Sequence, residues 1–123
     1  MTSKVQNIQY QLNEWAKEYG IEQYTVAFSG YRNMDESNPK RYVLGKCYYT
    51  TRNRCDIYLG WRFEDRKLGW RETSVLFHEF CHALAYLEDG EGDAHNDYWR
   101  ELRRSKPKYL IGDWLAKMTY LFM

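Results

Sequence analysis

Residues 73–88 read TSVLFHEFCHALAYLE, and this stretch sets the expectations for the rest of the chain. Its apolar side chains recur at the three- and four-residue steps of an amphipathic helix. Thr73 or Ser74 is suited to cap the N-terminus of such a helix, because a hydroxyl can accept a hydrogen bond from a free backbone N–H group. The sequence therefore predicts a helix from about residue 71 to residue 88.

The centre of this helix carries the motif His78-Glu-Phe-Cys-His82. Side chains four residues apart project from one helix face, so both imidazoles can reach the same ion. Glu79 is rotated by about 100° from His78 and can handle a bound water molecule without being a ligand. The motif predicts a catalytic metal site, with His78 and His82 as ligands and Glu79 as the general base.

A catalytic zinc ion usually has three protein ligands and one open position, so a third ligand is needed. The chain contains three histidines, and the remaining one is His95. The break at Asp89-Gly-Glu-Gly-Asp93 would let the chain turn back and present His95 to the helix. We therefore expect Zn²⁺ as the cofactor, with water activated by a fall in its pKa from 15.7 to about 7.

The segments before this helix predict one helix and three strands. An amphipathic helix over residues 4–19 is ended by Gly20, and the pattern then changes to that of strands. Three strands are expected, at residues 24–28, 41–50 and 55–63, with a hairpin connection at 51–54 and a loop at 31–40. We expect them to form a small antiparallel sheet. The strand Cys55–Leu59 could be an exposed edge that pairs with an extended peptide, or lie in the sheet interior.

Two further helices are expected after the motif. Asp93 can cap a helix over about residues 94–104, which Pro107 stops. A last helix carries apolar side chains at helical spacing, and we interpret this stripe as core packing: Leu110, Ile111, Trp114, Leu115, Met118, Leu121 and Phe122. The fold class is α+β, in one domain spanning residues 1–123.

Composition excludes several classes of protein. The 123 residues have a formal net charge of +1, which argues against a strongly basic, histone-like binder. Three cysteines without a Cys-x-x-Cys pair argue against a disulfide framework and a zinc ribbon. No secretory signal or bilayer-spanning stretch is apparent, so we expect an intracellular, cytoplasmic monomer without membrane association.

The region from Gly45 to Trp99 resembles the SprT-like metalloproteases. The resemblance is carried by His78-Glu-Phe-Cys-His-Ala-Leu-Ala-Tyr-Leu-Glu-Asp-Gly90, followed by His95 and Trp99. Upstream, Gly45-Lys-Cys-Tyr48 and Asp56-Ile-Tyr-Leu59 are similar to the two strands that precede the helix in that family. The resemblance implies a zincin-like minimal protease domain, zinc bound by the three histidines, catalysis by Glu79, and proteolysis of proteins attached to DNA.

The sequence departs from that family in two places. Asn96 follows the third histidine where the family usually has Gly, and we expect no zinc ribbon or DNA-binding tail beyond the protease domain. DNA contact would then fall to the domain's own basic run, and a DNA-directed role would place the protein in the nucleoid or nucleus. The run comprises Arg100, Arg103, Arg104, Lys106 and Lys108.

Three questions stay open at this point. Tyr86, Tyr98 and several arginines are candidates for stabilising the oxyanion of a peptidase reaction. An alternative function is a zinc-stabilised nucleic-acid or protein binding module without hydrolytic activity, although a structural zinc site has no need of Glu79. A calcium site in residues 89–93 lacks the Gly and Glu that an EF-hand loop needs at its sixth and twelfth positions.

Overall fold

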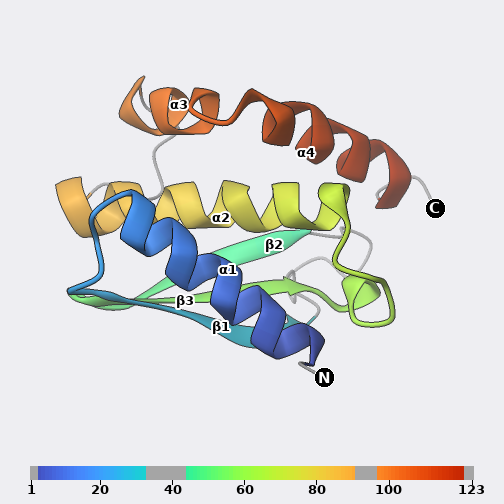
Figure 1. Ribbon diagram of the computed structural model, residues 1–123, viewed down its shortest axis with the longest axis horizontal. Coiled ribbons are helices and arrows are strands. Elements are labelled where there is room, and N and C mark those ends of the chain that lie inside the picture. Colours follow the sequence, from blue (N-terminus) through green and yellow to red (C-terminus); the bar gives the residue numbers. More distant parts are fainter. Residues whose placement is uncertain (1–2, 33–43, 91–96, 121–123) are drawn as a thin grey trace, which may run out of the picture.

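The protein has a three-stranded sheet with its helices gathered on one side (Figure 1). A computed structural model describes residues 3–32, 44–90 and 97–120. Its elements are α1 (Lys4–Glu18), β1 (Thr25–Arg32), β2 (Gly45–Thr51), β3 (Arg54–Gly60), the 3₁₀ turn η1 (Trp61–Phe63), α2 (Trp70–Asp89), α3 (Asp97–Arg104) and α4 (Pro107–Tyr120). This arrangement confirms the α+β class.

Helix α1 begins and ends as its sequence indicates. Ser3 and Gln6 form a capping box, in which each side chain bonds the other residue's backbone N–H. At the other end Gly20 has φ +73°, a left-handed conformation that favours glycine. The helix buries one face, and its Trp15 ring lies edge-on to Phe77 of α2 at 5.1 Å between centroids. This contact joins α1 and α2 in one core above the sheet.

The sheet is mixed, so the expectation of a wholly antiparallel sheet is wrong. The strand order is β1–β3–β2, with β2 antiparallel to β3 and β1 parallel to β3. The hairpin between Thr51 and Arg54 confirms the predicted connection and makes β2 and β3 antiparallel. Strand β1 does not pair with its successor β2 but with β3. Because β3 lies between the other two strands, Cys55–Leu59 is sheet interior and does not form an exposed edge.

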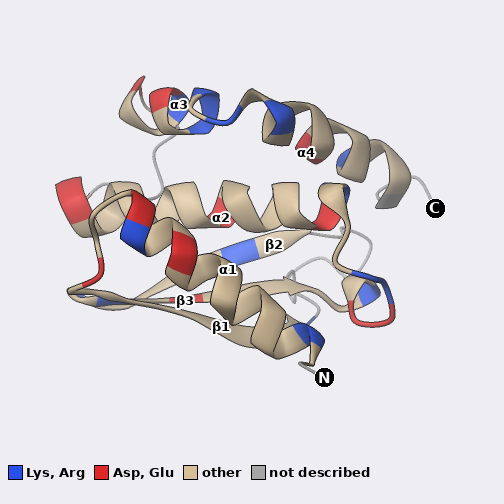
Figure 2. Cartoon of the chain, viewed as in Figure 1, with Lys and Arg blue, Asp and Glu red and all other residues tan. Residues whose placement is uncertain are grey.

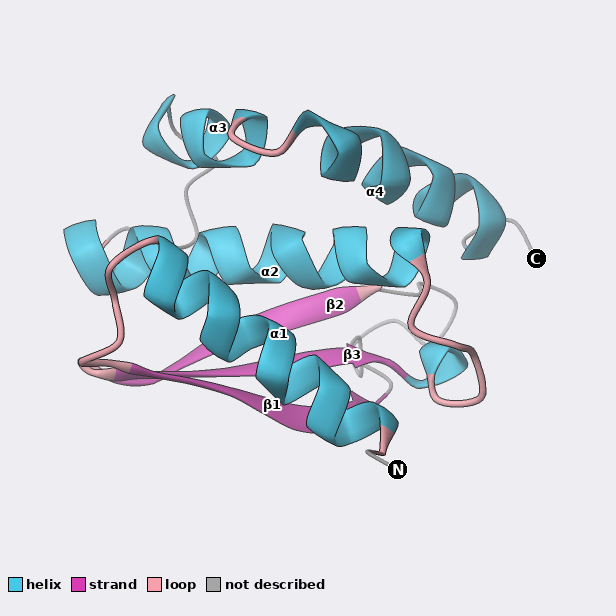
Figure 3. Ribbon diagram, viewed as in Figure 1, coloured by secondary structure: helices cyan, strands magenta, loops and turns pink. Residues whose placement is uncertain are grey.

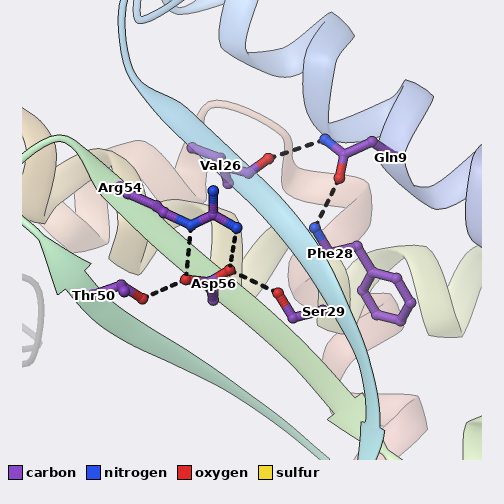
Figure 4. A network of polar contacts seen from close by, with 7 residues as sticks. All are labelled: Gln9, Val26, Phe28, Ser29, Thr50, Arg54 and Asp56. Carbon is purple, nitrogen blue, oxygen red and sulfur yellow. Dashed lines mark hydrogen bonds and ion pairs between the residues drawn. The ribbon is translucent and has the colours of Figure 1, made fainter.

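A polar network around Asp56 ties the three strands together on the sheet face away from the helices (Figure 4). Arg54 donates to the Asp56 carboxylate at 2.9 and 3.1 Å, Ser29 of β1 donates at 2.7 Å, and Thr50 of β2 also donates. The hydrogen bond from Arg54, followed by those from Thr50 and Ser29, outweighs burial and lowers the pKa of Asp56 to about 2. The carboxylate is therefore a charged junction of the sheet at neutral pH.

The free edge of β1 is covered by a side chain of α1. Gln9 Nε2 donates to the carbonyl of Val26 at 3.0 Å, and the backbone N–H of Phe28 donates to Gln9 Oε1 at 2.8 Å (Figure 4). An amide side chain that both donates and accepts in this way takes the place of a neighbouring strand. Strand β2 is the outermost strand on the opposite side of the sheet.

Two boundaries near the motif helix differ from those expected. The third strand ends at Gly60, and residues 61–63 form η1 instead of continuing the strand. Helix α2 begins at Trp70 with Gly69 as its N-cap, so neither Thr73 nor Ser74 is the cap. Both hydroxyls instead donate to carbonyls one turn earlier, at 2.8 and 2.7 Å. The helix ends as predicted, with Gly90 in the left-handed conformation (φ 74°).

Helices α3 and α4 form a second layer that lies on α2 (Figure 3). Helix α3 ends at Arg104 before Pro107 as expected, but Pro107 also begins α4, where its fixed φ suits the first turn. The predicted start of α3 at residues 93–96 lies outside the described residues.

The apolar stripe of α4 is not a core face, which corrects the expectation. Ile111, Trp114 and Met118 are 58%, 59% and 48% exposed, whereas Asp113 and Ala116 are buried against the rest of the protein. The remaining members of the stripe are half-buried or lie outside the described residues: Leu110, Leu115, Leu121 and Phe122.

Close packing of α4 on α2 explains why its small and acidic face turns inward. A Cβ atom at Gly112 would lie 2.0 Å from Ser74 Oγ, so only glycine allows the two helices to come this close. The same approach places Asp113 beside the histidine motif. The contact of Asp113 with the histidine motif, and not the apolar periodicity of α4, therefore accompanies the face that α4 turns toward α2.

Candidate metal centre

The two histidines of α2 point one nitrogen each at the same point in space. His78 Nε2 and His82 Nε2 are 3.3 Å apart, and the rings are tilted by 57° with centroids 5.0 Å apart. Both residues lie on one face of the helix, as the four-residue spacing predicts. Ligand atoms of His78, Glu79 and His82 all lie within 4.8 Å of one another. The structure therefore brings together three of the four residues predicted for the site.

The Glu79 carboxylate is buried beside the two imidazoles, next to the beginning of β2. Burial raises its pKa, although the neighbouring charge of His78 opposes this effect. A Cβ atom at Gly45 would lie 3.0 Å from Glu79 Cγ and 3.2 Å from Oε2. The absence of a side chain at Gly45 therefore makes room for the carboxylate, which is a candidate proton acceptor of raised basicity.

Asp113 of α4 contacts the motif from the side away from the His82 ring. Its Oδ2 lies 3.2 Å from His78 Nδ1, the ring nitrogen that does not face His82. Burial would raise the pKa of Asp113, but the hydrogen bond and charge of His78, together with Lys117 and Arg103, hold it below its usual range. Asp113 is therefore a buried carboxylate that acts as a hydrogen-bond acceptor for the site.

Trp99 and Arg103 of α3 cover the other side of the site. The Trp99 ring stacks on His82 at 5.1 Å and 27°, and meets His78 edge-on at 5.2 Å. The Arg103 guanidinium lies over the same indole at 5.0 Å and donates to Asp113 at 3.0 Å. Arg103 is buried in these contacts, which leaves little of its side chain exposed for the predicted contact with phosphate.

The donor set and its spacing fit a zinc ion. With metal–nitrogen bonds of about 2.0 Å, two nitrogens 3.3 Å apart subtend about 110° at the ion, near the tetrahedral angle. Asp113 contacts Nδ1 of His78, and the other ring nitrogen, Nε2, faces His82. His78 and His82 are therefore suited to hold the ion, with the Glu79 carboxylate close by.

Comparison with known proteins decides the family. A profile of the SprT-like family matches residues 9–108, most of the chain. The chain belongs to the SprT-like family. No curated protein and no solved structure matches it. The match extends from α1 to the start of α4 and includes the motif helix, so the whole site described above lies in the SprT-like region except for Asp113 and Lys117.

The SprT-like motif predicts His95 as the third ligand, and His95 lies outside the described residues. Helix α3 begins at Asp97, two residues later in the sequence, and its Trp99 lies on both histidine rings. The predicted acidic break at residues 89–93, and with it the calcium alternative, also falls largely outside the described residues.

Neither tyrosine considered for oxyanion stabilisation has its hydroxyl directed at the histidines. Tyr86 donates to the Thr51 carbonyl at 3.2 Å, and Tyr98 donates to the Glu88 carboxylate. Burial, and then the contact with Glu88, raises the pKa of Tyr98 above its ordinary value. Both hydroxyls serve local contacts at the far end of α2.

The remaining cations of the basic run are distributed along the outer layer (Figure 2). Arg100, Arg104 and Lys108 are exposed, and Arg100 lies 3.4 Å from Asp97 of the same helix. Lys106 is half-buried and pairs with Glu18 of α1 at 2.9 Å. The exposed part of the run is therefore smaller than the sequence indicates.

Other sequence expectations can be compared directly with the described residues. Cys47, Cys55 and Cys81 are all buried free thiols, in agreement with the expected lack of a disulfide framework. Among the described residues, no helix is long and apolar enough to cross a bilayer.

Proposed function

We propose that this chain is a zinc-dependent endopeptidase in which His78, His82 and His95 hold the metal. The observation that carries the proposal is the pair of facing Nε2 atoms, 3.3 Å apart, with the Glu79 carboxylate buried beside them. The chemistry that a bound zinc ion supplies is activation of a water molecule and polarisation of the scissile carbonyl. Membership of the SprT-like family supports the same assignment.

The residues of the chain have separate tasks in this proposal. Glu79 accepts a proton from the attacking water and passes it to the nitrogen of the leaving amine. Its burial makes it a stronger proton acceptor than an exposed glutamate. The alternative, a zinc-stabilised binding module, leaves the position of Glu79 unexplained, because a structural zinc site needs no carboxylate beside its ligands.

An extended peptide substrate is best placed along β2. This strand is outermost in the sheet, and its first residue, Gly45, lies against Glu79. A peptide that pairs with β2 through its backbone would pass the carboxylate, with side chains alternating between the two faces. The opposite edge strand, β1, is covered by Gln9.

Metal analysis coupled to a cleavage assay tests the proposed function. We expect gently purified protein to contain about one zinc ion per chain, as three imidazoles and an open position favour four-coordinate zinc. It should cleave casein or histone, measured with and without single-stranded DNA. A content well below half an equivalent of any transition metal would contradict the metal assignment.

Action on DNA-associated proteins is part of the proposal, and the exposed cations of α3 and α4 support it. Arg104 and Lys108 are exposed, so the double change Arg104→Glu and Lys108→Glu should abolish weak, roughly micromolar binding of single-stranded DNA. Binding of the wild type should weaken with salt at a log–log slope of about −0.7 per neutralised phosphate. Cleavage of a short free peptide should not change.

The control for this experiment carries the same change of charge elsewhere. Lys17 and Lys67 are exposed on α1 and on the turn before α2, and their double change to Glu should leave DNA binding close to that of the wild type. If both double variants bind DNA equally well, the basic run is a solvated surface, and we would regard the protein as a general or partner-directed peptidase.

A further inference from the structure

A closed chain of contacts links the two motif histidines through α3 and α4. His78 Nδ1 lies 3.2 Å from Asp113 Oδ2, and Arg103 Nη2 donates to the same oxygen at 3.0 Å. The Arg103 guanidinium lies over Trp99, and Trp99 stacks on His82. Each imidazole of the motif is therefore held by a side chain from the outer helical layer.

Three nitrogen atoms converge on one oxygen of Asp113. Besides His78 and Arg103, Lys117 Nζ lies 3.6 Å from Oδ2. A carboxylate can only accept hydrogen bonds, so its contact with a neutral imidazole requires the proton on Nδ1 of His78. The lone pair then lies on Nε2, the nitrogen that faces His82. Two cations beside Asp113 balance its buried charge.

We propose that Asp113 is the positioning residue of His78, fixing the ring and its Nδ1–H tautomer so that Nε2 is offered to the metal. The proposal rests on the proposed function for the identity of the metal site, but the tautomer itself is a property of the metal-free chain. Groups that orient a histidine ligand typically contribute 10- to 100-fold to metal affinity. Helix α4, which carries none of the predicted ligands, thereby becomes part of the site.

The convergence on a single oxygen decides which substitutions are informative. Asp113→Asn would keep an oxygen facing the three donors, so it would preserve the hydrogen bond to His78. Asp113→Leu removes the acceptor but leaves a buried guanidinium without its anion. The decisive comparison is therefore the double variant Asp113→Leu, Arg103→Met against Arg103→Met alone, where Lys117 still balances Asp113.

The experiment is nitrogen NMR of the full, metal-free chain with ¹⁵N-labelled histidine at a pH where His78 is neutral. His78 is assigned from a His78→Gln variant. We expect the Nδ1–H tautomer in the wild type and in Arg103→Met, and a shift toward Nε2–H in the double variant. Zinc affinity, measured by competition with a chelator, should be about 10- to 100-fold weaker in the double variant than in Arg103→Met.

The possible outcomes are distinguishable. A wild-type spectrum with the His78 proton on Nε2 overturns the proposal, even if the double variant fails to fold. Equal tautomer populations and zinc affinities within twofold in the two variants overturn it as well. If the wild type binds no zinc, the proposed function fails, while the tautomer comparison still judges the role of Asp113.

Discussion

Glu79→Gln is expected to reduce peptide cleavage by about two to four orders of magnitude while the zinc content stays near that of the wild type. Glutamine keeps the size of the side chain but cannot accept a proton at working pH. Steady-state cleavage of a fluorogenic peptide, together with metal analysis, measures both quantities.

Glu72→Gln is the matched control, because Glu72 is also buried on α2 but lies in its first turn, away from the motif. We expect this change to leave cleavage within a few-fold of the wild type. A Glu79→Gln variant that cleaves at the wild-type rate would show that Glu79 is not the base. If both variants lose activity with intact metal, the loss reflects disturbance of the helix and not proton transfer.

His82→Ala is expected to remove most of the bound zinc and, with it, cleavage. The change deletes one of the two facing nitrogens and leaves a void under the Trp99 ring. Because an ion that binds only the folded state stabilises it by mass action, chelator should lower the Tm of the wild type but leave the Tm of this variant nearly unchanged. Emission spectroscopy and thermal unfolding with and without chelator measure these effects.

Cys81→Ala separates loss of metal from loss of packing. Cys81 precedes His82 on the same helix and is fully buried, so its removal should destabilise the fold by about 1 kcal/mol or more without touching the predicted ligands. This variant should keep its zinc and its response to chelator. Full zinc occupancy in His82→Ala would refute the assignment of His82 as a ligand.

Features that depend on local spacing along the chain can be predicted from the amino-acid sequence alone. Residues close together along the chain explain the apolar periodicity of α1 and α2 and the left-handed glycines at positions 20 and 90. They also explain the hairpin between β2 and β3. The same holds for His78 and His82, since the pitch of a helix places residues four apart on one face. These features were predictable without knowledge of the tertiary fold.

Contacts between segments that are distant in the sequence depend on the folded chain as a whole. The parallel pairing of β1 with β3 joins strands that are not consecutive, and no local pattern specifies it. Trp61–Phe63 continues the apolar pattern of β3, yet it turns into a 3₁₀ helix once the strand has left the sheet. In each case the pairing partner, and not the propensity of the segment, sets the outcome.

At the site, the outer helices α3 and α4 show how local sequence and tertiary packing contribute differently. Asp113 lies off the apolar stripe of α4, on the face that periodicity alone assigns to solvent, yet its side chain is buried. Its contact with His78 depends on Gly112, which lets α4 approach α2 closely enough. The sequence indicates that Arg103 is one cation of a basic run, but its side chain is buried between Trp99 and Asp113. Spacing along one helix places His78 and His82 on the same face, whereas packing between helices decides which side chains contact them.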